Sequence, residues 1–174
     1  AGIMADAVPG RLSATLLGMA SASLGAGVGE LAAGLVAPAA SPFAVVGGAL
    51  IDVAPPWAKD AAIALFGTDD KVALLVGIAL ALLGLAALAG LWEARRPPWG
   101  RVALAGFGVV GAIAAMTRAD AGGLSWLPST VAGAAAATAL WLLTRMARSL
   151  SAAHGMQTDL EPTARTAGPR DPGR

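Results

Sequence analysis

Residues Ala37 to Lys71 read APAASPFAVVGGALIDVAPPWAKDAAIALFGTDDK and lie between two strongly apolar segments. Four prolines and six charged residues make the stretch too polar and too broken to cross a bilayer. Its apolar residues nevertheless recur at helical spacing, which a water-exposed loop does not require. We therefore expect a structured cap that lies on the membrane face and is held there by the hydrophobic segments on either side.

Two short helices are predicted within this cap. Ser41 and Pro42 mark the start of the first, with serine as N-cap and proline at the first helical position. It would run over residues 43–53, which is too short to span a bilayer. A second short amphipathic helix is predicted over residues 57–66, after the proline pair at 55–56. Beyond it, Thr68 is expected to N-cap the next long helix.

The composition excludes several classes of protein. Of the 174 residues, 56% are hydrophobic and only 13% are charged, whereas soluble domains average about 25% charged residues. The absence of cysteine excludes disulfides and thiolate metal sites, and the single histidine, His154, excludes bis-histidine haem ligation within the membrane. No basic stripe with interleaved aromatic residues indicates a nucleic-acid partner.

Four long apolar segments predict an all-α membrane protein with a lipid bilayer as its surroundings. The predicted fold is a four-transmembrane-helix bundle with a short-helix cap on the extracytoplasmic face. The spans are expected at about 12–36, 72–92, 102–117 and 127–144, with the cap at 37–71. They form a membrane domain over residues 12–148, preceded by a leader at 1–11 and followed by a disordered polar tail at 149–174.

The distribution of basic residues predicts the orientation. If four helices alternate, six arginines at positions 11, 95, 96, 101, 145 and 148 fall on one side. The other side carries Lys59, Lys71 and Arg118 among more numerous acidic residues. The positive-inside rule then places both termini in the cytoplasm. All five tryptophans fall at or near predicted helix ends, as in an aromatic belt.

Small residues in the first span predict a helix-packing face. Ser21, Gly25 and Gly29 are four residues apart, which lets another helix approach closely. The stripe is consistent with packing inside the bundle, with a dimer face, or with chance in a chain rich in alanine and glycine.

Glu30 is the only carboxylate within a predicted span, and a charge deep in lipid costs a few kcal/mol. It is expected to face protein or the membrane interface. Two roles remain open: a structural pair with Arg118 or Lys71, or a proton or cation site.

Several segments together resemble a known protein family. They are residues Gly29 to Leu35 (GELAAGL), Ala40-Ser41-Pro42, Ile51-Asp52, Pro55 to Asp60 (PPWAKD), Phe66 to Lys71 (FGTDDK) and Thr117 to Gly122 (TRADAG). In these segments the chain resembles the N-terminal membrane domain of bacterial molybdopterin-dependent oxidoreductases of the sulfite-oxidase-like group. The resemblance covers roughly residues 12–147 and implies location in the bacterial cytoplasmic membrane.

In that family the bundle precedes a further hydrophobic segment and a catalytic domain that binds the molybdenum cofactor. This chain departs from the pattern after Arg148, where the sequence becomes polar. The family's molybdenum-ligating cysteine has no counterpart, so molybdopterin is expected only in a separate catalytic domain or subunit. A fragment, a frameshifted product and a free-standing anchor subunit remain alternatives.

The resulting hypothesis is a non-catalytic membrane anchor that tethers or docks this catalytic domain. No catalytic, cofactor-binding or metal-ligating residue is expected in the chain itself. The candidate structural and docking residues are Glu30, Asp52, Trp57, Lys59, Asp60, Asp69, Asp70, Lys71, Arg118 and Asp120. The alternative is a quinone-interacting electron-transfer subunit that uses Glu30, Arg118 and interfacial tryptophans. A small transporter or channel is the third and weakest hypothesis, since Glu30 alone supports it.

Overall fold

The fold is described from a computed structural model of the chain. It covers the backbone of residues 10–53, 55–57, 60, 64, 70–119 and 121–166, and their side chains except those of 50, 51, 53, 70–75 and 154–166. Of the candidate residues, Lys59, Asp69 and Asp120 lie outside the described residues, and Asp70 and Lys71 are described in backbone only. Most of the second short helix predicted at 57–66 also lies outside them.

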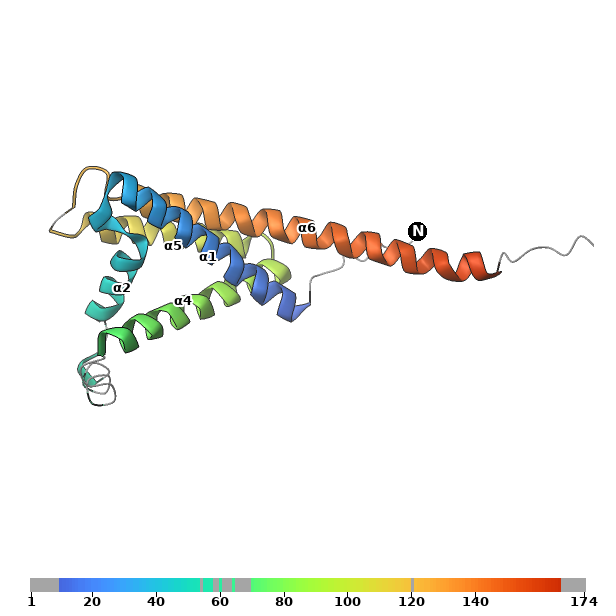
Figure 1. Ribbon diagram of the computed structural model, residues 1–174, viewed down its shortest axis with the longest axis horizontal. Coiled ribbons are helices and arrows are strands. Elements are labelled where there is room, and N and C mark those ends of the chain that lie inside the picture. Colours follow the sequence, from blue (N-terminus) through green and yellow to red (C-terminus); the bar gives the residue numbers. More distant parts are fainter. Residues whose placement is uncertain are drawn as a thin grey trace, which may run out of the picture.

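The described chain is helical and contains no strand (Figure 1). Its long helices are α1 (Arg11–Val36), α4 (Asp70–Arg95), α5 (Trp99–Met116) and α6 (Leu127–Thr166). Between α1 and α4 lie a short 3₁₀ helix, η1 (Pro38–Ala40), and the helix α2 (Pro42–Val53).

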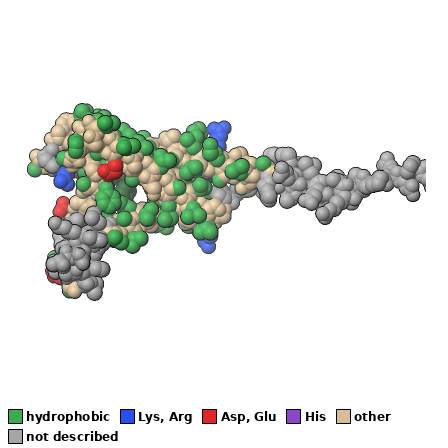
Figure 2. Space-filling view, viewed as in Figure 1, with side chains coloured by type: hydrophobic (Ala, Val, Ile, Leu, Met, Phe, Trp, Pro, Cys, Tyr) green, Lys and Arg blue, Asp and Glu red, His purple; other side chains and the backbone are tan. Residues whose placement is uncertain are grey.

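The predicted all-α four-helix bundle is confirmed within the described residues. Four helices are long and apolar enough to cross a membrane: Arg11–Val36, Val76–Arg95, Trp99–Met116 and Leu127–Ala153. Each contains one predicted span or most of it. Apolar side chains are spread along the face seen in Figure 2, and the basic side chains visible there lie near the two ends of the bundle. This distribution is that of a multi-pass membrane protein, whose apolar surface faces lipid.

The four long helices run up and down in sequence (Figure 1), and each contacts two of the others, so that together they form a closed bundle. The helix α1 packs between α4 and α6, while α5 packs between α6 and α4. We call the end that carries α2 the cap end, and the opposite end, where α4 meets α5, the turn end. Because α2 has only 12 residues, it is roughly 18 Å long and lies across the cap end instead of spanning.

Small residues set the distances between neighbouring helices. A Cβ atom added at Gly25 would lie 2.6 Å from the Cβ of Ala136, and one at Gly29 would lie 2.6 Å from the Cβ of Ala132. Ser21 is also fully buried. The Ser21, Gly25 and Gly29 stripe therefore packs against α6 within the same chain, which was one of the three open interpretations.

The remaining helix pairs use similar contacts. The backbones of Gly18 in α1 and Gly90 in α4 are so close that a Cβ on either would fall within 3 Å of the other's Cα. Gly108 in α5 and Gly133 in α6 form an equivalent contact, where the added Cβ would lie 2.7 Å from the opposite Cα. Dispersion between backbones in close contact holds such helices together, because lipid provides no hydrophobic drive between them.

The C-terminal part of α6 differs from the sequence-based expectation. The fourth helix does not end near Thr144 but continues to Thr166, so residues 149–166 are helical here where the sequence predicts a disordered tail. Residues 145–154 contain neither glycine nor proline, and Ser149 and Ser151 donate their hydroxyls back to helix carbonyls at 2.8 and 3.0 Å. Residues 145–154 therefore contain no helix-breaking residue, and the helix can continue past the predicted end at Thr144.

Candidate functional site

A group of hydrogen bonds at the cap end joins the C-terminal part of α1 to the start of α2. The Ser41 hydroxyl lies 2.8 Å from both carboxylate oxygens of Glu30, to which it donates. The backbone N–H of Phe43 donates to Glu30 Oε1 at 3.0 Å, and the N–H of Ala44 donates to the Ser41 hydroxyl oxygen at 3.3 Å. The predicted N-cap role of Ser41 is confirmed, and α2 begins at Pro42 as expected.

Glu30 therefore has a structural role, but with partners that the sequence did not indicate. Its carboxylate accepts hydrogen bonds from a hydroxyl and from a backbone amide in the first turn of α2. The unpaired N–H groups there carry partial positive charge, so a carboxylate in this place is stabilised by the helix dipole as well. The predicted partner Lys71 has no described side chain.

The helix α2 is fixed from below by a small apolar cluster. Val45 of α2, Ala40 of η1 and Ala115 of α5 are almost fully buried and pack together. A Cβ added at Gly47 would lie 3.5 Å from Ile78 of α4. The helix thus contacts α1, α4, α5 and α6 and forms a roof over the cap end.

Arg118, in the loop after α5, also reaches this roof. Its Nη1 would lie 3.3 Å from a Cβ added at Gly48, so the guanidinium lies against the middle of α2. Glu30 and Arg118, which are 88 positions apart in the sequence, therefore contact the same short helix at different points. Asp52, Trp57 and Asp60 are exposed, and Trp57 retains 73% of its accessible surface.

At the turn end, a second carboxylate likewise accepts a backbone N–H from the first turn of the next helix. Glu93, in the last turn of α4, is 1% exposed, and its Oε2 accepts the backbone N–H of Arg101 in the first turn of α5 at 3.2 Å. Arg101 Nε lies 2.6 Å from Glu93 Oε1, although its N–H is not directed for a hydrogen bond, so charge holds this contact. From the sequence, Arg101 was considered as one of the six arginines that predict the orientation.

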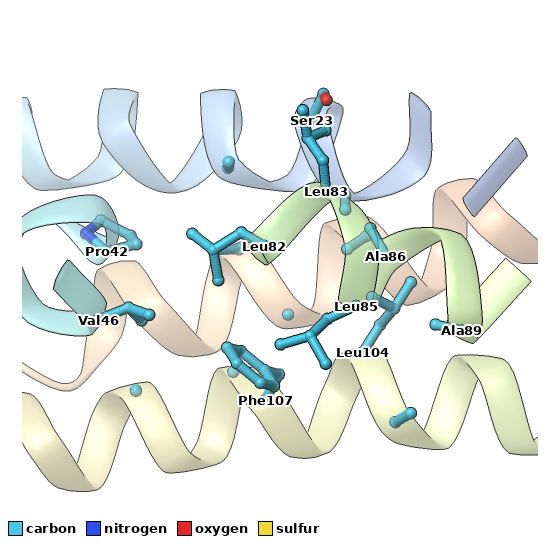
Figure 3. Close-up of a pocket in the computed structure, with 18 of the residues that line it drawn as sticks. Ser23, Pro42, Val46, Leu82, Leu83, Leu85, Ala86, Ala89, Leu104 and Phe107 are labelled. Carbon is cyan, nitrogen blue, oxygen red and sulfur yellow. The ribbon is translucent and has the colours of Figure 1, made fainter. Parts of the chain in front are cut away.

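Under α2 lies a pocket of about 450 Å³ bounded by the five described α-helices, α1, α2, α4, α5 and α6 (Figure 3). Leu82 and Leu85 of α4, Leu104 and Phe107 of α5 and Val46 of α2 extend into it. Trp92 is part of the lining, but Glu30 and Arg118 are not among the residues that line it. The structure therefore does not bring together the quinone site proposed from sequence, which combined Glu30, Arg118 and tryptophans.

The residues of this chain do not fit a molybdenum cofactor. The sequence contains no cysteine to ligate the metal. Within the described part of the chain, no group of three or more histidine, cysteine, aspartate or glutamate side chains could hold a metal ion.

Comparisons with protein-family models, with curated proteins and with solved structures find no match to this chain.

Three residues with functional or structural contacts were not predicted as site residues: two at the turn end and one in the pocket. Glu93 and Arg101 flank the proline pair at 97–98, and an acid and a base on either side of such a turn are a signal for an ion pair. Ser129 follows Pro128 in the first turn of α6 and lines the pocket. Its burial could not be inferred, because it depends on how closely Gly111 of α5 approaches.

Proposed function

We propose that this chain is a membrane anchor for a molybdopterin-dependent oxidoreductase of the sulfite-oxidase-like group, and that its cap faces outward to hold the catalytic domain. The supporting observation is the convergence of the segments that carry the resemblance. Glu30 from the first segment bonds Ser41 from the second, and Arg118 from the last lies against α2. Residues spread over the sequence thus build one rigid corner at one end of the bundle.

The surface available for docking lies beyond this corner. Asp52, Trp57 and Asp60 are exposed, and an exposed tryptophan next to two carboxylates combines a large apolar contact area with charge that selects a partner. The proposed partner therefore presents an apolar pocket with basic residues around it. The proposal includes the orientation expected from the arginines, with both termini in the cytoplasm of a bacterium.

The test is recovery of molybdenum with the native protein. An antibody against the cap is used to isolate the product from membranes of the organism that encodes the chain, and its mass and molybdenum content are measured. Molybdenum is expected either in a product much larger than 17.0 kDa or in a partner that co-purifies with a product of that mass. Isolation without molybdenum, from cells that contain molybdopterin enzymes, would refute the proposal.

Photo-crosslinking locates the interface. A photo-crosslinking amino acid at position 57 is expected to capture the molybdenum-containing domain, because Trp57 is exposed in the cap. The matched control is position 80, since Leu80 is 64% exposed on the lipid-facing side of α4 and should capture only lipid. Equal capture from both positions would show that the cap is not the docking surface.

A further inference from the structure

The pocket beneath α2 has the size and position of a ligand site. Its volume of about 450 Å³ lies within the range of roughly 300–1,000 Å³ that is typical of small-molecule sites. Several lining residues of α4 and α5 are also exposed on the bundle surface, among them Leu85 at 49% and Phe107 at 43%. A molecule dissolved in the bilayer therefore has access from the side.

The lining indicates an uncharged ligand. None of its residues carries a charge, and the only polar side chains are Ser23 and Ser129. A phosphate or ammonium headgroup would lose its hydration there without gaining a counter-charge. Two aromatic side chains, Phe43 of α2 and Phe107 of α5, line the space near Ser129 and offer faces and edges to a planar ring, whereas Trp92 of α4 lines it near the turn end.

Ser129 provides a polar group that the protein itself does not satisfy. Its residue is 3% exposed, and its Oγ has no hydrogen-bond partner among the described residues. Other hydroxyls of α6 behave differently, since Thr130, Thr138 and Thr144 all donate to carbonyls of their own helix. The Ser129 Oγ packs against Gly111, and rotation about χ1 between staggered positions can release it towards an acceptor in the pocket.

We propose that this pocket binds an isoprenoid quinone, with a ring carbonyl accepting a hydrogen bond from Ser129, the ring packed between Phe43 and Phe107, and the tail extending along the pocket towards Trp92. A quinone matches the three features together, because it is neutral, planar and equipped with carbonyl acceptors. A phospholipid chain would match only the apolar lining and would leave the Ser129 hydroxyl unpaired. The inference does not depend on the anchor function, since every residue involved belongs to this chain.

The binding test uses the full chain in non-ionic detergent, titrated with decylubiquinone and followed by quenching of tryptophan fluorescence. Wild-type protein is expected to show saturable quenching, since Trp92 lines the site. Ser129→Ala should weaken binding roughly three- to tenfold, the effect of losing one hydrogen bond. Thr138→Ala is the matched control, because Thr138 is exposed on the same helix and does not line the pocket; its affinity should stay within about twofold of wild type.

A second pair of variants tests the location without relying on Ser129. Ala103→Phe places a ring in the pocket lining, whereas Ala105→Phe places the same ring on the exposed side of α5. Ala103→Phe should abolish saturable quenching and Ala105→Phe should preserve it, with equal helical content by circular dichroism.

Two results would overturn the proposal. One is quenching that does not saturate, or that changes equally in Ala103→Phe and Ala105→Phe. The other is Ala103→Phe displacing co-purified phospholipid while quinone binding stays unchanged, which would identify an acyl chain as the occupant. The two proposals can fail separately. If the chain binds decylubiquinone saturably but the native product is isolated without molybdenum, the quinone site is supported and the anchor proposal is refuted.

Discussion

The Ser41 hydroxyl donates a hydrogen bond to the Glu30 carboxylate at 2.8 Å. This contact fixes the corner at which the chain passes from the long helix α1 to the cap. The same hydroxyl oxygen accepts the N–H of Ala44 at 3.3 Å, so Ser41 is at once the N-cap of α2 and the link to α1. Glu93 and Arg101 form an analogous corner at the turn end, where a carboxylate at the end of α4 accepts an N–H at the start of α5. Both turns contain proline. In both, a carboxylate near the end of one helix accepts a backbone N–H from the first turn of the next helix and so holds the start of that helix in place.

Replacing Ser41 or Glu30 should loosen the cap corner. Ser41→Ala removes the N-cap and one donor to Glu30, and we expect a loss of about 1–2 kcal/mol of unfolding free energy. Glu30→Gln should cost about 1 kcal/mol, because the amide keeps one acceptor oxygen but loses the charge. Titration with sodium dodecyl sulfate in mixed micelles, followed by circular dichroism, measures both.

The two effects should not add. Because both residues belong to one hydrogen-bond network, the double variant is expected to lose less than the sum of the single losses. Asp52→Asn, on an exposed residue of α2, is the control and should change stability by less than about 0.5 kcal/mol. Additive losses would show that Glu30 and Ser41 act independently.

At the turn end, the two members of the ion pair should respond unequally. Arg101→Met leaves the Glu93 carboxylate, which is 1% exposed, without its counter-charge and should cost about 2–3 kcal/mol. Glu93→Gln should cost less, since the Arg101 side chain is 29% exposed and can reach water. The same unfolding assay compares them. A larger loss in Glu93→Gln would contradict this account of the pair.

The glycine contact between α1 and α4 should not tolerate a methyl group. Gly18→Ala would bring a Cβ within 2.8 Å of Gly90 Cα, and separating the two helices should cost about 1–3 kcal/mol. Gly27 is in the same helix with nothing within 4 Å of an added Cβ. Gly27→Ala should be neutral or stabilise by up to about 1 kcal/mol through its higher helix propensity. If Gly18→Ala and Gly27→Ala were equally stable, the close contact between Gly18 and Gly90 would be refuted.

The proposed orientation can be tested by labelling, because the natural chain contains no cysteine. Trp57 is exposed in the cap and Trp99 is 60% exposed at the turn end. In intact cells stripped of any outer barrier, a membrane-impermeant maleimide should label Trp57→Cys and not Trp99→Cys. Permeabilising the inner membrane should expose position 99. The reverse pattern would place the cap in the cytoplasm.

Local features of the sequence were sufficient to predict much of this fold. Hydropathy and length indicate the four spans, because a helix must satisfy its own backbone over about 20 residues in lipid. Ser41 and Pro42 predict the start of α2 correctly, because capping depends on residues within one turn. The stripe of Ser21, Gly25 and Gly29 predicts a packing face, because its four-residue spacing is a property of the helix itself.

Only the tertiary structure shows which residues contact Glu30, Glu93 and Ser129. Glu30 bonds Ser41 and Phe43 because η1 folds the chain back over the end of α1, a path that spacing alone does not reveal. Glu93 is buried because Gly100 of α5 packs against its Cβ. Ser129 lines a pocket because five helices surround a space that their side chains leave unfilled. Periodicity is set by neighbours in the sequence, whereas hydrogen-bond partners and cavities are set by how separate helices pack.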